Sequence, residues 1–220
     1  MLEVRNLGKF YELRKHWYLK KEKNLIFKDV NFSLNLKENL LICGESGVGK
    51  STLGKILCFL QKPSFGEVIY KNLNLHDLNH EKQRLLRKEI QYVFQDQKQA
   101  LNPYRKVKNL IKDGLLNFNL KNETLLLKLF ENFKLKKELL EQKAFELSGG
   151  EAARIGLIRA LVLKPKILII DEIDANLDIK NIKNILKFLE NFQKENEISY
   201  IFISHKEKFF ENFLYKKIKL

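Results

Sequence analysis

The residues Gly44-Glu45-Ser46-Gly47-Val48-Gly49-Lys50-Ser51, followed by Thr52, fit the pattern G-x-x-x-x-G-K-[ST]. The apolar run 39–43 before them predicts a buried strand, and apolar residues recur at helical spacing from Leu53 to Leu60. A strand, a glycine-rich loop and a helix suit phosphate, because backbone N–H groups and the positive end of the helix dipole face the anion. Lys50 can reach the terminal phosphates and Ser51 can offer its hydroxyl to Mg²⁺. The loop therefore predicts a nucleotide site.

The composition limits the class of protein. The chain has 220 residues, of which 45% are hydrophobic and 31% are charged, so we expect one soluble globular domain. No apolar run reaches the length of a membrane span, and residues 1–5 lack the core of a signal peptide. The net charge of +14 could attract nucleic acid or anionic lipid, but the lysines are scattered from Lys9 to Lys219. Cys43 and Cys58 have no metal-binding spacing, and we interpret them as buried thiols in a reducing cytoplasm.

Strands and helices alternate along the chain. Residues 12–24, which include Trp17, form a polar, basic connection, and residues 107–140 predict an all-helical insert, because Leu, Ile and Phe recur at i, i+3 and i+4. We expect further strands at residues 2–5, 25–36, 67–70, 89–94, 166–171 and 199–204, and helices at residues 80–88, 148–163 and 178–194. This order, around a phosphate loop, indicates an α/β fold with a mostly parallel sheet.

Two acids, Asp171 and Glu172, follow the apolar run 167–170. The carboxyl end of a strand in an α/β sheet is where ligands bind. Asp171 would hold Mg²⁺ through water, and Glu172 could polarise an attacking water molecule. Acids can also cap a buried strand with no further role, but the phosphate loop favours the functional interpretation.

The run Leu147-Ser148-Gly149-Gly150-Glu151 opens a second predicted helix. Ser148 and Glu151 have the spacing of a capping box, which is a structural role. The two glycines also expose backbone N–H groups at a helix N-terminus, which is a second anion site. Two such sites beside one phosphate loop suggest a nucleotide that is shared between two subunits.

Taken together, these motifs resemble those of the ATP-binding-cassette (ABC) ATPases. The resemblance rests on the phosphate loop, Gln95 after a strand, Leu-Ser-Gly-Gly-Glu, Asp171-Glu172, Leu177-Asp178 and Ser204-His205, and covers nearly the whole chain. It implies an α/β P-loop NTPase fold with a RecA-like core, a small antiparallel β subdomain and an inserted α-helical subdomain. Residues 1–220 would then form a single ABC ATPase domain. Within it, 1–94 and 147–220 would form the core with the β subdomain, and 95–146 the Q-loop and the helical subdomain.

The resemblance also implies how ATP and Mg²⁺ are bound. Two cassettes would face head to tail and enclose two ATP molecules. Tyr11 would stack on adenine, with its neighbour Phe10 as the alternative, and Asp178 would lie in a loop at the dimer interface. The loop of one subunit would hold the phosphates through Gly44, Glu45, Ser46, Gly47, Val48, Gly49, Lys50, Ser51 and Thr52, and the partner would add Ser148, Gly149 and Gly150.

Four residues receive catalytic roles from the same resemblance. Glu172 would be the base, and His205 would hydrogen-bond the γ-phosphate and hold the transition state. Gln95 would contact Mg²⁺ and the attacking water, and Lys50 would bind the phosphates. The metal ligands would be Ser51, Gln95 and Asp171.

Fewer residues indicate the subfamily than indicate the ABC family itself. Phe94-Gln95-Asp96 with Leu101-Asn102-Pro103 is similar to the ATPases of nickel and di/oligopeptide importers, and an end at Leu220, soon after His205, favours the nickel type. This implies a second ATPase subunit, in a homo- or heterodimer, and two permease subunits at the cytoplasmic face of the inner membrane. It also implies an indirect partnership with a substrate-binding protein, and no nucleic acid.

Two alternative functions remain. One is the ATPase of a lipoprotein-release or efflux system, because the sequence Asn176-Leu177-Asp178 resembles the corresponding segment of those ATPases. The other is a soluble ABC ATPase that acts on nucleic acid or ribosomes, which the positive charge would suit.

Overall fold

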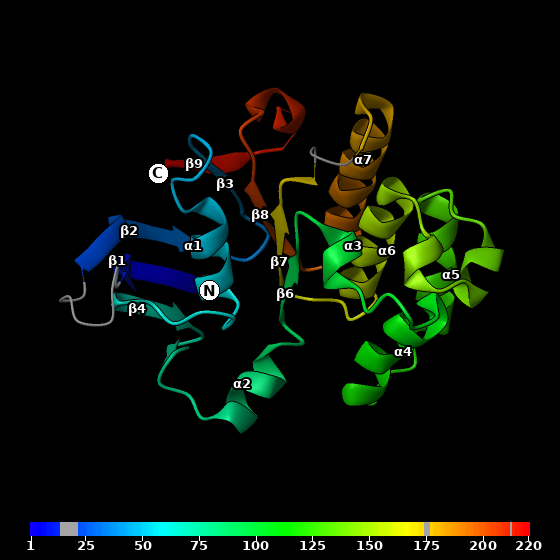
Figure 1. Ribbon diagram of the computed structural model, residues 1–220, viewed down its shortest axis with the longest axis horizontal. Coiled ribbons are helices and arrows are strands. Elements are labelled where there is room, and N and C mark those ends of the chain that lie inside the picture. Colours follow the sequence, from blue (N-terminus) through cyan, green and yellow to red (C-terminus); the bar gives the residue numbers. More distant parts are fainter. Residues whose placement is uncertain (14–21, 174–176, 212) are drawn as a thin grey trace.

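The computed structural model describes residues 1–13, 22–173, 177–211 and 213–220 (Figure 1). Most of the predicted basic connection, with Trp17, and residues 174–176, with Asn176, lie outside the described residues. The described chain forms a parallel sheet, an antiparallel sheet and a group of helices (Figure 1).

The parallel sheet has the strand order β6-β7-β8-β3-β9, and every neighbouring pair is parallel. Its strands are β3 (Asn39–Cys43), β6 (Ile90–Val93), β7 (Ile167–Asp171), β8 (Ser199–Ile203) and β9 (Tyr215–Lys219). All residues of β3, β7 and β8 are buried, which explains their unbroken apolar runs. β9 was not expected, because three of its five residues are lysines and its Tyr215 and Ile218 are only partly buried.

The antiparallel sheet has the order β2-β1-β4-β5. Its strands are β1 (Leu2–Leu13), β2 (Glu22–Leu34), β4 (Phe65–Tyr70) and β5 (Leu73–Asn74). The pairing of β1 with β2 extends to Leu13 opposite Glu22, so β1 is longer than the predicted strand 2–5. Register shifts between Val4 and Phe10 interrupt the alternation of side chains there, which hides the strand in the sequence.

The helices α1 (Lys50–Leu57) and α2 (His80–Leu86) belong to the first part of the chain. The later helices are α3 (Gln97–Ala100), α4 (Val107–Asn117), α5 (Glu123–Asn132), α6 (Gly149–Leu161) and α7 (Ile179–Glu195), with 3₁₀ turns at Lys137–Glu141, Ala144–Glu146 and Glu207–Phe210. The predicted insert 107–140 is therefore helical, with breaks where Asn119 and Lys134 adopt positive φ angles of 51° and 52°. No helix of the described part of the chain has the length and apolar composition needed to cross a bilayer.

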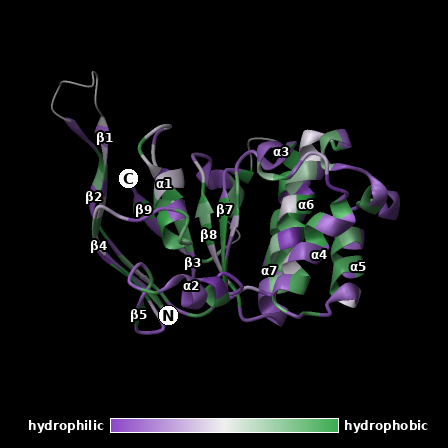
Figure 2. Ribbon diagram, turned by 60° about the horizontal axis from the view of Figure 1, so that its bottom comes forward, coloured by the Kyte–Doolittle hydropathy of each residue, from purple (hydrophilic) through white to green (hydrophobic). Residues whose placement is uncertain are grey.

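The parallel sheet separates two hydrophobic cores. Leu40 and Ile42 of β3 face α1 and the antiparallel sheet, whereas Leu41 faces the core of α4 to α7. Figure 2 shows the hydrophobic strands of the parallel sheet between α1 on one side and α6 and α7 on the other. This alternation follows from the two-residue period of a strand, and each fully buried side chain contributes about 1.5–3 kcal/mol.

Helix α1 lies unusually close to the sheet. A Cβ atom on Gly54 would come within 2.7 Å of Ile203 Cδ1 and 2.9 Å of the Tyr92 ring. The absence of a side chain therefore allows the close packing that brings the first residues of α1, Lys50 and Ser51, to the ends of the strands.

Candidate functional site

The predicted phosphate loop joins β3 to α1. Gly44, Gly47 and Gly49 have φ angles of 151°, 85° and 103°, which L side chains rarely adopt. Gly49 is also the N-cap of α1 and accepts the N–H of Leu53 at 2.9 Å. The loop consequently turns back across the N-terminus of α1, where the N–H groups of the first turn would face a bound anion.

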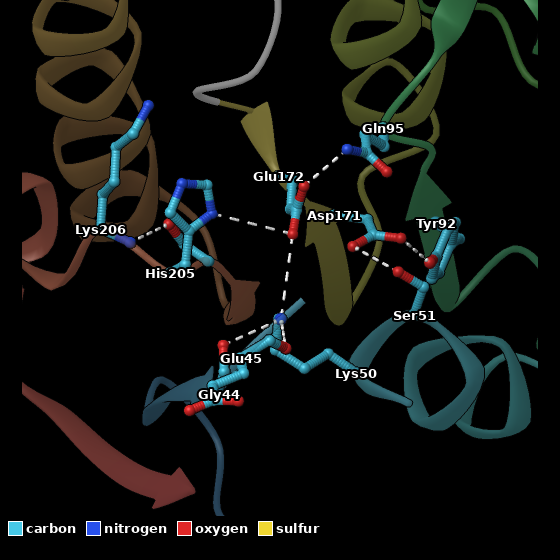
Figure 3. A network of polar contacts seen from close by, with 11 residues as sticks. Gly44, Glu45, Lys50, Ser51, Tyr92, Gln95, Asp171, Glu172, His205 and Lys206 are labelled. Carbon is cyan, nitrogen blue, oxygen red and sulfur yellow. Dashed lines mark hydrogen bonds and ion pairs between the residues drawn. The ribbon is translucent and has the colours of Figure 1, made fainter. Parts of the chain in front are cut away.

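Lys50 is the charged residue inside this loop. It is only 5% exposed, and its Nζ donates to the backbone oxygens of Gly44 at 3.0 Å and Glu45 at 2.7 Å (Figure 3). These two bonds hold the ammonium group where a phosphate bound by the loop would lie. An incoming phosphate would exchange neutral carbonyl partners for a charged one, which is a stronger interaction.

Asp171 and Ser51 meet at the end of β7. The Ser51 hydroxyl donates to Asp171 Oδ1 at 3.1 Å, and the Tyr92 hydroxyl donates to Oδ2 at 2.5 Å (Figure 3). Burial and the neighbouring Asp171 raise the pKa of Tyr92, so its hydroxyl keeps its proton. The carboxylate is therefore held at both oxygens.

Tyr92 was missed by the sequence reasoning. It lies in the predicted strand 89–94, where a tyrosine would pass for an ordinary core residue. A buried tyrosine hydroxyl needs a polar partner, and this requirement is the signal that could have drawn attention to it.

Glu172 is the centre of the contact network in Figure 3. Its Oε1 lies 4.0 Å from Lys50 Nζ and 3.9 Å from His205 Nδ1. Its Oε2 accepts a hydrogen bond from Gln95 Nε2 at 2.5 Å. The side chain is 15% exposed, so a substrate can still reach a carboxylate that is fixed by three neighbours.

The backbone of Glu172 is strained. Its φ angle of 43° lies in the left-handed region, which costs a non-glycine residue about 1–2 kcal/mol. The residue keeps its backbone bond to the sheet, because its N–H donates to the Ile203 oxygen at 2.9 Å. Such strain is common where a functional side chain must be turned away from the direction of its strand.

The strand order explains why these groups meet. β6, β7, β8 and β3 are parallel neighbours, so Gln95, Glu172, His205 and the phosphate loop all follow the carboxyl ends of adjacent strands. A cavity of about 400 Å³ opens there, lined by Ser51, Lys55, Phe94, Gln95, Asp96, Gln99, Ala100 and Asp171. The oxygen atoms of Ser51, Gln95 and Asp171 match the hard ligands that Mg²⁺ prefers, so these residues fit the predicted metal.

Ser148, Gly149, Gly150 and Asp178 lie at helix N-termini. Ser148 caps α6: its Oγ accepts the Glu151 N–H at 3.2 Å, and Glu151 Oε2 accepts the Ser148 N–H at 2.8 Å. Asp178 caps α7 by accepting the Asn181 N–H at 2.8 Å. A Cβ on Gly149 would meet no atom within 4 Å, so the start of α6 is open to an approaching group. The predicted capping box is present, and an additional anion contact stays a prediction.

Tyr11 and Phe10 lie in β1. The Tyr11 hydroxyl and the Gln61 side chain are hydrogen-bonded at 3.0–3.2 Å, and Lys9 Nζ lies 5.2 Å from the centre of the Tyr11 ring. Lys23 Nζ lies 4.5 Å from the centre of the Phe10 ring. Each ring is thus already paired with a lysine, and the adenine contact of either one stays a prediction.

A phosphate loop, two acids at the end of a neighbouring strand and an adjacent histidine define a nucleotide-binding α/β protein. The family model described as "ABC transporter" matches residues 27–175, and this chain belongs to that family.

The curated relatives include three transport proteins. The oligopeptide transport ATP-binding protein AppF of Bacillus subtilis is 35% identical over 212 residues, and the dipeptide transport protein DppF of Escherichia coli is 34% identical over 209 residues. Both alignments cover 93% of this chain. The nickel import ATP-binding protein NikE of Shigella boydii is 32% identical over 198 residues, which is 88% of this chain. The chain spans 64% of the length of AppF, 63% of DppF and 74% of NikE.

The fold is also that of solved cassettes. A dimeric structure of the bacterial ABC transporter cassette MJ0796 superposes with a TM-score of 0.84 at 27% identity, covering 95% of this chain and 90% of that one. A dimeric post-hydrolysis state of MJ0796, bound to ADP and Pi, has a TM-score of 0.83 at 26% identity with the same coverage. The predicted fold class is confirmed.

Proposed function

We propose that this chain hydrolyses ATP as the energy-coupling subunit of an ABC importer of the peptide or nickel type. The observation that carries the proposal is the position of Glu172, whose carboxylate lies between Lys50, His205 and Gln95. A carboxylate at the mouth of a phosphate site, with one exposed edge, is suited to accept a proton from an attacking water molecule.

In this mechanism the loop residues 44–52 bind the phosphates through their N–H groups, and Lys50 moves from the Gly44 and Glu45 carbonyls to the terminal phosphate. Bound Mg²⁺ would neutralise phosphate charge, and Ser51, Gln95 and Asp171 are the residues placed to hold it. Water attacks the γ-phosphorus while Glu172 takes its proton, and the bond to the oxygen of the leaving ADP breaks. His205 donates a hydrogen bond to the transferred phosphoryl group.

The nucleotide site would be completed by a second cassette, which is either a copy of this chain or a related ATPase. The open start of α6, with Ser148, Gly149 and Gly150, would then contact the γ-phosphate that the partner's loop holds. Asp178, at the start of α7, would lie at the interface. The dimeric form of the similar cassette MJ0796 supports this arrangement.

The permease subunits would dock on the helical insert. Tyr104 and Phe145 are 77% and 58% exposed, and the Phe145 N–H donates to the Pro103 oxygen at 3.1 Å, so the two rings belong to adjacent segments. Exposed aromatic residues that are close together are typical of binding surfaces. A cytoplasmic segment of a permease is the partner that we propose for them, which would place the chain at the inner face of the membrane.

The names of the relatives specify oligopeptides, dipeptides or nickel, and this supports two cargo classes, peptides and nickel. We propose these as the two cargo classes to compare. Uptake of radiolabelled nickel and of a labelled tripeptide should be measured in cells that carry the full transporter with either wild-type chain or Lys50→Ala. The cargo whose uptake is lost in the variant is the transported one, and unchanged uptake of both would contradict the importer assignment.

The ATPase activity is tested with purified protein. Glu172→Gln should retain ATP and lower phosphate release at least 100-fold, because the amide cannot accept the proton. The matched control is Glu197→Gln, which changes a surface acid that pairs with Lys166 at 2.7 Å, and it should keep wild-type turnover. Persistent turnover in Glu172→Gln would show that another group is the base.

A further inference from the structure

Helix α6 contains a glycine in its middle, Gly156, where a helix would favour alanine. The space that a side chain would need is already occupied by Gln97. A Cβ atom on Gly156 would come within 2.3 Å of Gln97 Cδ and Oε1, which is closer than non-bonded atoms can approach. The two residues are therefore packed directly against each other.

Gln97 is buried, at 4% exposure, and its carboxamide is held from one side only. Its Nε2 donates to the Phe94 oxygen at 3.0 Å. Its Oε1 is buried and, among the residues that the structure describes, has no hydrogen-bond partner. A buried amide oxygen without a partner is unfavourable, so the polar environment does not account for a glutamine at this place.

The contact connects two parts of the proposed site. The hydrogen bond to Phe94 closes a turn, 94–97, that carries Gln95, and Gln95 donates to Glu172 at 2.5 Å. On the other side, Gly156 belongs to the helix that begins at the Ser148 cap. Helix α3, which starts with Gln97, packs on α6.

We propose that Gln97 is a positioning residue that makes the Gln95 turn and helix α6 move as one body. A displacement of Gln95 at the Glu172 carboxylate would push the Gln97 side chain against the bare backbone of Gly156. It would thereby shift the Ser148 turn that faces the second cassette. This inference rests on the proposed function. It concerns how the nucleotide site of one cassette affects the Ser148 turn, which would contact the ATP bound by the second cassette.

The test uses the Glu172→Gln protein, so that ATP persists, with and without Gly156→Ala. The added methyl group displaces the Gln97 carboxamide, but residues 44–52 are unchanged. ATP affinity, measured with a fluorescent ATP analogue, should stay within twofold. The protein concentration at which ATP produces half-maximal dimer, measured by sedimentation, should rise at least tenfold. With Glu172 intact, Gly156→Ala should lower kcat and leave KM for ATP unchanged.

The matched control is Gly114→Ala in α4. A Cβ there would lie 3.6 Å from Leu163, which is an ordinary contact, so dimerisation and kcat should not change. Removing the Gln97 side chain frees the space, and the double variant Gln97→Ala, Gly156→Ala should dimerise better than Gly156→Ala alone. Such a recovery would show that the two residues act through their mutual contact.

Three other outcomes would overturn the proposed role of Gln97. If Gly156→Ala dimerises with ATP as well as Gly114→Ala does, the inference is wrong. If Gly156→Ala does not fold, Gln97→Ala alone decides, and unchanged dimerisation would overturn the inference. If Glu172→Gln binds ATP but does not dimerise, the shared nucleotide site is wrong, and the inference that depends on it is overturned with it.

Discussion

Replacing Tyr92 by Phe tests whether a buried hydroxyl orients the carboxylate that would face Mg²⁺. The ring and its packing are retained, and only the donor to Asp171 Oδ2 is removed. Asp171 is 3% exposed and Tyr92 is 8% exposed, so water does not readily replace the lost bond. A hydrogen bond to a charged group contributes about 1.5–3 kcal/mol, and the free energy of unfolding should fall by that amount. For a chain of this size, the expected decrease in melting temperature is about 3–12 °C.

The metal dependence should change together with the stability. A carboxylate that has lost its orienting donor binds metal about 10–100-fold more weakly. The concentration of Mg²⁺ that gives half-maximal retention of ATP on the protein should rise accordingly, and it can be measured by filter binding without turnover.

A second tyrosine provides the control. The Tyr70 hydroxyl donates to Glu89 at 2.6 Å, but Glu89 is 29% exposed and also pairs with Lys71. Tyr70→Phe should therefore cost only about 1 kcal/mol of unfolding free energy and leave the Mg²⁺ requirement unchanged. If Tyr92→Phe matches wild type in both measurements, or if both variants shift the Mg²⁺ requirement equally, the hydroxyl does not orient Asp171.

Three further predictions concern stability. Burial raises the pKa of Tyr200, so the native state holds this proton more tightly than the unfolded chain, and the resulting stability is lost as the pH rises above about 10. Tyr200→Phe should flatten this decline by up to about 1.4 kcal/mol per pH unit in urea titrations between pH 9 and 11, and an unchanged slope would contradict the assignment. Ser148→Ala removes the cap of α6 and should cost about 1 kcal/mol in the same assay, whereas a cost near zero would mean that the capping box does not support the helix. Gly54→Ala should destabilise the protein by about 1–3 kcal/mol because its Cβ meets Ile203, while Gly114→Ala should stabilise it by about 0.5–1 kcal/mol; equal melting temperatures for the two would refute the packing argument.

The sequence was sufficient for features that depend on neighbouring residues. The phosphate loop, the capping box at Ser148 and the acids at the end of the strand 167–171 were each predicted from a short run of neighbouring residues. The alternation of strands and helices was likewise enough to predict a parallel α/β sheet, since buried parallel strands have continuous apolar runs.

Features that depend on distant residues could not be predicted in the same way. Tyr92 and Asp171 are 79 positions apart, and Gln97 meets Gly156 only because α3 packs on α6. β9 has three lysines in five residues, so its strand conformation comes from pairing with β3 rather than from its own pattern. In each case a tertiary neighbour supplies the constraint that a local pattern lacks.

The neighbouring positions of β6 and β7 have a consequence for how such a protein can diversify. The chain leaves the sheet after Val93 and rejoins it at Ile167, directly beside the strand that it left. The excursion between them contains α3 to α6 and the exposed aromatic residues Tyr104 and Phe145. Residues 101–147, between α3 and the Ser148 cap, can therefore be lengthened, shortened or exchanged without altering the hydrogen bonds of the parallel sheet, whereas Gln95 and the start of α6 stay with the proposed nucleotide site. Selection for a new partner and selection for phosphate chemistry can act on separate parts of one chain.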